Sequence, residues 1–236
     1  MNENAKNPTK SFSHYDLEEA LRGRGCAVCR LVNHTAHRYL ANLLYELVND
    51  PGVQKEFKDS LGLCNRHAYQ LLDFGDGLGT AVLYRAATRK LLELLSAAPD
   101  GPRAPAALRA LLGRPPKADP AIPEPGSGCM VCRSEEKAEE RYLRALLDGA
   151  EDGSLDVLLD GPGAVCVRHL SRASAMAEGR LPHALVEVTW SALRDLNTDL
   201  GEYVRHSDYR FSDEPWGKER DSWKRVVQRI VGQRRA

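Results

Sequence analysis

Apolar residues recur at helical spacing along most of the chain. After Cys29 they fall three and four residues apart as far as Val48, and the same period runs from Leu78 to Leu95. This spacing gathers the apolar side chains on one face of a helix. Runs of β-branched residues bounded by turn residues are almost absent, which disfavours an all-β fold. The pattern predicts an all-α protein.

Helix ends are marked by short polar stretches. One helix is expected to stop at Asn49-Asp50-Pro51-Gly52. Asp50 and Pro51 suit the N-cap and the first turn of a further helix, predicted over Val53 to Leu61. A later helix, from about Pro182, carries two apolar stripes, which predicts that both of its faces are packed.

The second half of the chain repeats the first. At an offset of 103 residues the segments around the first cysteine pairs coincide, and after one deletion the offset becomes 102. The matched segments are Gly25-Cys26-x-Val28-Cys29-Arg30 with Gly128-Cys129-x-Val131-Cys132-Arg133, Arg38-Tyr39-Leu40 with Arg141-Tyr142-Leu143, and Cys64-x-Arg66-His67 with Cys166-x-Arg168-His169. We expect an internal duplication: helical units with pseudo-two-fold symmetry, each tied by a Cys3His metal site.

Five segments follow from the repeat and from the distribution of proline. We predict a flexible tail (1–13), a first helical metal-binding repeat (14–97), a Pro-rich linker (98–127), a second helical metal-binding repeat (128–200), and a C-terminal loop and helix (201–236). The linker is assigned because prolines cluster there and interrupt helices.

Composition limits the classes of partner. The formal charge is zero and the pI is about 7.0, so no global basic field calls for nucleic acid or an anionic membrane. The N-terminus has no apolar core typical of a signal peptide, and no apolar run approaches the roughly 20 residues of a membrane span. We therefore expect a cytoplasmic protein, where paired cysteines bind metal more often than they form disulfides.

Every cysteine belongs to a pair with a two-residue spacer. Three thiolates and one imidazole suit a tetrahedral, thiophilic metal, so two Zn²⁺ ions are predicted. The expected ligands are Cys26, Cys29, Cys64 and His67 in the first half, and Cys129, Cys132, Cys166 and His169 in the second. An iron–sulfur cluster is the alternative, although no C-x2-C-x2-C run is present. The sequence leaves open whether the half-sites pair within or between the repeats.

Charged residues near these motifs have two interpretations. Arg66 and Arg168 directly precede the histidines and could stabilise the negative site or an accompanying carboxylate, or could be solvated. The carboxylates that follow Cys132, from Glu135 to Glu140, are interpreted as a solvated helical face with ion pairs to Lys137 and Arg141.

A non-repeated segment near the C-terminus collects polar and aromatic groups. These are His206, Asp208, Tyr209, Arg210 and Trp216. They could form a ligand or partner site on a loop, or a structural cap across the two units. No nucleophile or phosphate-binding loop accompanies them, so an enzyme is not favoured.

The twin cysteine motifs, the repeated Arg-Tyr-Leu triplet and the segment from Arg205 to Trp216 resemble a prokaryotic family known only as a domain of unknown function. The resemblance spans most of the chain and implies a cytoplasmic, mostly helical protein. From the residues, we expect a metal-stabilised scaffold that acts through a protein or small-molecule partner. An iron–sulfur redox or sensor protein, and a nucleic-acid-binding regulator suggested by the arginine-rich final helix, are the alternatives.

Overall fold

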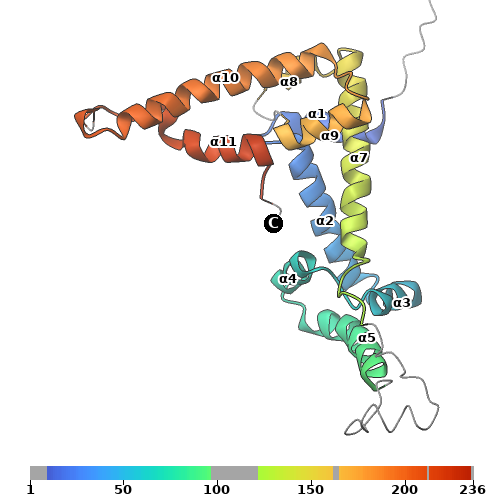
Figure 1. Ribbon diagram of the computed structural model, residues 1–236. Helices are drawn as coiled ribbons and strands as arrows, with labels where there is room; N and C mark the ends of the chain where they lie inside the picture. The colour runs from blue at the N-terminus through green and yellow to red at the C-terminus, as the bar shows by residue number, and fades with distance from the viewer. Residues whose placement is uncertain (1–9, 97–121, 162–164, 212, 235–236) are drawn as a thin grey trace, which may run out of the picture. The chain divides into compact units, whose positions relative to one another are not determined.

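The protein is helical throughout the part that is described. The computed structural model describes residues 10–96, 122–161, 165–211 and 213–234, and these ranges contain no β-strand (Figure 1). The all-α prediction is confirmed. The helices are α1 (Phe12–Leu21), α2 (Ala27–Tyr45), α3 (Pro51–Asp59), α4 (Asn65–Asp73), α5 (Gly77–Ser96), α7 (Met130–Glu151), α8 (Asp156–Leu159), α9 (Val167–Met176), α10 (His183–His206) and α11 (Ser222–Val231), with the 3-10 helices η1 (Tyr209–Phe211) and η2 (Lys218–Asp221).

Local capping explains several helix ends. Asp50 caps α3 by accepting a hydrogen bond from the Val53 amide at 2.9 Å, and Pro51 occupies the first turn, as predicted. Ser11 caps α1 in the same way, so helix begins at Phe12, inside the segment expected to be a flexible tail. The first part of that expected tail, residues 1–9, and most of the expected linker, residues 98–121, lie outside the described residues.

The chain divides into two compact units, and two helices contribute to both. The first unit comprises Met1–Thr35 and Glu135–Ala236, and the second comprises Ala36–Ser134. The start of α2 therefore belongs to the first unit and its end to the second, whereas α7 starts in the second and continues into the first. These boundaries differ from those of the sequence repeats.

Each unit has its own apolar core. In the first unit, leucines of α1, α7 and α8 are fully buried, among them Leu17, Leu21, Leu143, Leu146 and Leu159. In the second, Phe57 of α3 packs with leucines of α2, α4 and α5, namely Leu40, Leu43, Leu71 and Leu83. Burial of these side chains supplies the main driving force for packing the helices.

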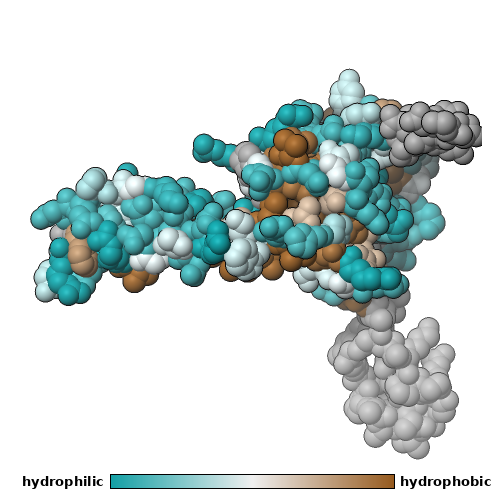
Figure 2. Space-filling view, turned by 90° about the horizontal axis from the view of Figure 1, so that it is seen from above, coloured by the Kyte–Doolittle hydropathy of each residue, from teal (hydrophilic) through white to brown (hydrophobic). Residues whose placement is uncertain are grey.

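Helix α10 and helix α11 lie side by side as a hairpin within the first unit (Figure 1). Only one stripe of α10 is buried, including Leu185 and Leu196. The second stripe is exposed: Val186, Trp190 and Val204 keep 46%, 60% and 71% of their surface. The prediction that both faces of this helix are packed is wrong, because α10 projects beyond its neighbours. The surface of the hairpin is largely hydrophilic, with isolated apolar residues (Figure 2).

Candidate metal centres

The eight predicted ligands form two groups of four. Site 1 consists of Cys26, Cys29, Cys166 and His169, and site 2 of Cys64, His67, Cys129 and Cys132. Within each group all ligand atoms lie within 4.8 Å of one another. Each cysteine pair of one sequence half therefore meets the cysteine–histidine pair of the other half. Of the two pairings that the sequence leaves open, the structure has the one between the halves, so neither predicted repeat is tied by its own four residues.

The length of α2 explains this exchange. Its 19 residues rise about 1.5 Å each, so the rigid helix carries the chain away from Cys29 before α3 and α4 form. Cys64 then caps α4 in the second unit, where Cys129 at the start of α7 is its neighbour. The near-equal spacings of 34 and 33 residues between pairs permit either pairing, and the packed helices bring together the pairs of different halves.

All four motifs occupy the same place on a helix. The first cysteine of each pair directly precedes α2, α4, α7 or α9, and the second ligand is the third residue of that helix. Side chains at these two positions face each other across the first turn, as in a capping box. The positive end of the helix dipole favours thiolate there. Each site thus joins two helix N-termini.

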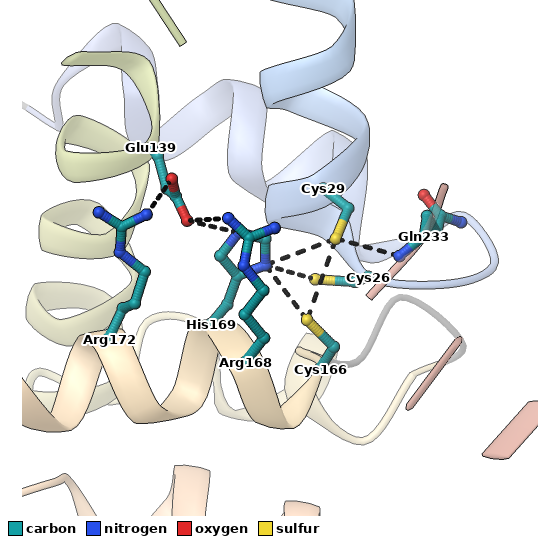
Figure 3. Close-up of polar contacts among 8 residues, drawn as sticks. All are labelled: Cys26, Cys29, Glu139, Cys166, Arg168, His169, Arg172 and Gln233. Carbon is teal, nitrogen blue, oxygen red and sulfur yellow. Dashed lines mark hydrogen bonds and ion pairs between the residues drawn. The ribbon is translucent and has the colours of Figure 1, made fainter. Parts of the chain in front are cut away.

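In site 1 three thiols surround one ring nitrogen. His169 Nδ1 lies 3.3 Å from Cys26 Sγ, 3.5 Å from Cys29 Sγ and 3.2 Å from Cys166 Sγ (Figure 3). The Sγ atoms of Cys29 and Cys166 are 3.9 Å apart. All four residues are buried. The donor set and its closeness fit a single metal ion.

Glu139 of α7 holds the other side of the histidine. Its Oε1 lies 2.9 Å from His169 Nε2, and its Oε2 accepts a hydrogen bond from Arg172 at 2.6 Å. Arg168 approaches Oε1 at 3.7 Å (Figure 3). Such a carboxylate–histidine pair fixes the tautomer in which Nδ1 is free to bind metal. Burial opposes ionisation of Glu139, but His169, Arg172 and Arg168 lower its pKa, so it stays a carboxylate.

The solvated-face interpretation fails at two of the four glutamates. Glu135 and Glu139 each expose only 2% of their surface, whereas Glu136 and Glu140 are exposed as expected. Sequence reasoning therefore missed Glu139 as part of the site. The signal was present: Glu135 lies three residues before the buried Ala138, and Glu139 lies three and four residues before the buried Tyr142 and Leu143.

The contacts within site 1 shift the pKa values of Cys26, Cys166 and His169. Hydrogen bonds with the thiols of Cys166 and Cys29 lower the pKa of Cys26 far below its usual range, and the contact with Cys26 raises the pKa of Cys166. Burial alone would lower the pKa of His169, but its contacts with Cys26, Cys29 and Glu139 raise it to about 11. A metal must displace protons from Cys166 and His169 to bind, so its affinity depends on pH.

The C-terminal segment closes site 1. The backbone amide of Gln233 donates to Cys29 Sγ at 3.4 Å (Figure 3). Gly232 has φ +91°, and a Cβ there would lie 2.9 Å from Cys29 Sγ and 3.3 Å from Cys166 Sγ. Arg229 donates to the carbonyl of Val165, the residue before Cys166, at 3.3 Å. Glycine is thus required both by the backbone conformation and by the closeness of the sulfurs.

Site 2 has similar geometry but is more open. His67 Nδ1 lies 3.3 Å from Cys64 Sγ and 3.4 Å from the sulfurs of Cys129 and Cys132. The Sγ atoms of Cys64 and Cys132 are 3.6 Å apart. His67 and Cys129 are buried, whereas Cys64 and Cys132 are partly exposed. Gly126 (φ +75°) packs directly on the backbone of Cys64, where an added Cβ would lie 2.4 Å from the Cys64 Cα atom.

The contacts within site 2 also shift pKa values. Burial alone would raise the pKa of Cys129, but the hydrogen bond with His67 and backbone contacts lower it to about 6. Burial, together with the thiol of Cys64, raises the pKa of Cys132 to about 12. The lowered pKa of Cys129 favours its thiolate, whereas a metal must displace the proton of Cys132 to bind that sulfur.

The segment after α10 does not form one convergent site. The ring of His206 packs on Trp216 with centroids 4.9 Å apart, and Tyr203 packs on the same indole at 5.2 Å. Asp208 pairs instead with Arg210 at 2.6 Å on the surface, and Tyr209 is 85% exposed. A surface groove nearby includes Trp216 but none of the other four predicted residues. His206 and Trp216 thus make packing contacts of the kind expected for a structural cap, and both residues lie within the first unit.

Comparison with known proteins identifies the family. Residues 11–236 match the family described as "Family of unknown function (DUF6062)". The chain belongs to this family. It is also 37% identical over 59 residues to the "Uncharacterized 23.9 kDa protein in xynA 3'region" of Caldicellulosiruptor sp. (strain Rt8B.4), a match that covers 25% of this chain and 29% of that relative. No solved structure matches the chain. Among the helices described, none is long and apolar enough to cross a membrane.

Proposed function

We propose that the DUF6062 chain is a zinc-binding helical scaffold that acts through contacts with a protein or small-molecule partner. The observation that carries the proposal is the assembly of two Cys3His groups, each at the meeting point of two helix N-termini. All four protein ligands of each group converge, which is typical of structural zinc sites rather than of catalytic ones with an open position.

The distances support a single ion in each site. Ligand atoms about 2.3 Å (sulfur) and 2.0–2.1 Å (nitrogen) from a tetrahedral zinc lie roughly 3.5–3.8 Å apart. The sulfur–nitrogen separations in the two sites are 3.2–3.5 Å. The sulfurs of Cys29 and Cys166 are 3.9 Å apart and those of Cys64 and Cys132 are 3.6 Å apart. An iron–sulfur cluster places its ligands on different irons and spreads them further apart. The observed distances thus favour one zinc ion per site over a cluster, and an iron–sulfur redox or sensor protein is the second candidate.

The proposed duplication gives the ions a specific role. If the two halves arose from one motif, each zinc would join a helix of one half to a helix of the other. A reducing compartment such as the cytoplasm would keep the thiols available for metal, and all six are free. Zinc binding would then contribute directly to the free energy of folding.

The nucleic-acid alternative receives less support from the last helix. Its basic residues are largely engaged within the chain: Arg225 pairs with Asp199 at 3.0 Å and with Asp221 at 2.6 Å. Arg229 donates to a carbonyl beside site 1. We therefore favour a protein or small-molecule partner.

Elemental analysis after anaerobic purification tests the proposal. We expect about two zinc ions per chain, no iron and no visible absorption, followed by loss of helical circular dichroism when a strong chelator is added. A brown preparation that contains iron and inorganic sulfide would favour the iron–sulfur alternative. A folded chain that binds neither metal would contradict both.

A further inference from the structure

The two sites differ in how well their sulfurs are covered. Of the six cysteines, Cys64 and Cys132 are partly exposed and the other four are buried. Both exposed thiols belong to site 2, and their Sγ atoms lie 3.6 Å apart although they come from different helices, α4 and α7. Site 2 therefore contains the two less buried cysteines, and their sulfurs are adjacent.

Site 1 is closed by contrast. Gly232 and Gln233 lie against Cys29, and Glu139 blocks the far side of His169. A groove of about 410 Å³ runs beside Cys26 and Cys166, yet these residues expose only 3% and 1% of their surface. The cysteines of site 1 are thus better shielded from an oxidant in water than Cys64 and Cys132 of site 2.

We infer that Cys64 and Cys132 are an oxidation site at which a peroxide forms a disulfide and expels the metal of site 2, while site 1 keeps its metal. The inference rests on the proposed function, because the metal holds both sulfurs as thiolates. The thiolate is the form of cysteine that reacts with peroxides, and susceptibility follows thiolate character and exposure.

The reaction is balanced by one peroxide. One thiolate attacks a peroxide oxygen, the O–O bond breaks, and hydroxide leaves to give a sulfenic acid. The second thiolate attacks the sulfenic sulfur, the S–O bond breaks, and a second hydroxide leaves as the disulfide forms. Two protons from solvent convert the hydroxides to water. The sulfurs supply two electrons, and hydrogen peroxide accepts them.

The geometry requires only a small movement. A disulfide bond is about 2.05 Å long, so the two sulfurs must approach by about 1.5 Å from their separation of 3.6 Å. The metal of site 2 would keep only Cys129 and His67 and would dissociate. The new bond would still join α4 to α7, so the second unit would exchange a metal cross-link for a covalent one.

Zinc release and disulfide mapping on the intact, zinc-loaded chain test the inference. The chain is first shown to hold two zinc ions, which separates failure of the proposed function from failure of this inference. Hydrogen peroxide is then added in the presence of a chromogenic zinc indicator, and the products are alkylated, digested and analysed by mass spectrometry. We expect one equivalent of zinc to leave at least about tenfold faster than the second, together with a Cys64–Cys132 disulfide that a dithiol reverses.

Two variants serve as matched controls. Cys64→Ser should abolish the fast equivalent and the disulfide, because site 2 has lost one of the reacting sulfurs. A chain that ends at Val231 lacks the cover over Cys29 and Cys166, so its site 1 should become as sensitive to peroxide as site 2. The wild-type measurement needs neither variant to fold. Release of both zinc ions at one rate, or a disulfide formed in site 1 or between Cys129 and Cys132, would overturn the inference.

Discussion

Glu139 Oε1 lies 2.9 Å from His169 Nε2, while Nδ1 of the same ring faces three thiols. The carboxylate comes from α7 and the histidine from α9, so the candidate metal site includes a fifth side chain beyond its four candidate ligands. Partners of this kind commonly change metal affinity by about 10- to 100-fold.

The first prediction concerns this carboxylate. Glu139→Gln should weaken zinc at site 1 by about 10- to 100-fold and leave site 2 unchanged, because the amide cannot stabilise the ring as a carboxylate does. Competition with a chelator of known affinity measures both sites. Glu140→Gln, on the next residue, alters an exposed ion pair with Arg144 and should leave both affinities as in the wild type. Equal loss from the two variants would contradict the assigned role.

The second prediction tests how the half-sites pair. Cys26→Ser combined with His169→Ala damages one site twice, so the chain should still bind one zinc ion. Cys26→Ser combined with His67→Ala damages both sites, so binding should fall toward zero. Zinc per chain is measured by mass spectrometry, with circular dichroism to verify that the chain is folded. If each repeat closed its own site, the two double variants would exchange results.

The third prediction concerns Gly232. Gly232→Ala should speed zinc loss from site 1, because the methyl group would lie 2.9 Å from Cys29 Sγ. Gly75→Ala is the matched control: Gly75 also has positive φ, +70°, but nothing lies within 4 Å of a Cβ there. Both substitutions strain the backbone, and the cost is larger at Gly232, because its ψ of 178° places it in a region essentially confined to glycine. Only the first should change the rate of zinc release measured with an indicator.

The fourth prediction concerns pH and Asp199. This carboxylate, 96% buried, pairs with Lys218 and Arg225 at 3.0 Å each. Burial opposes its charge, but the two cations lower its pKa below 3.8. Because the folded pKa is below the unfolded one, the stabilisation is present above about pH 4 and is lost as the pH falls through the folded pKa.

Asp199→Asn should therefore lower the free energy of unfolding by about 1–2 kcal/mol near pH 7. The effect is limited because one of the two cations, Lys218, is largely exposed. The difference from wild type, measured by thermal unfolding, should stay constant between about pH 5 and 8 and shrink below about pH 4. Asp195→Asn, one turn earlier on α10, disturbs only a 3.8 Å surface contact with Arg194 and should have little effect. A difference that grows on acidification would have the wrong sign.

Much of the fold was predictable because local signals agreed with it. The helical period, the Asp50–Pro51 start of α3 and the placing of ligands at helix N-termini were all present in the sequence. The eight candidate ligands were found because cysteine and histidine recur at one fixed spacing. Their pairing was not predictable, since the near-equal spacings permit either combination and the packing of the helices decides between them.

Glu139 and the Gly232 closure were missed for different reasons. Glu139 was assigned to a solvated face because its neighbours offered ion pairs, although it lies in phase with the buried positions of α7. Gly232 contacts Cys29 from about 200 residues away, and no local pattern reports such a contact. Long-range approach of backbone to sulfur is a property of the packed chain alone.

The exchanged pairing makes the two sites nested along the chain, which sets an order in which a nascent chain can complete them. His67 and Cys129 are 62 residues apart, whereas Cys26 and His169 are 143 apart and enclose them. As the chain leaves the ribosome, the inner site has all its ligands first. Cys26 and Cys29 emerge before any other ligand, yet they must wait for the latest ones and then for the final residues that cover them. Cys26 and Cys29 are thus synthesised first, but their site is the last to have all its ligands and its covering residues.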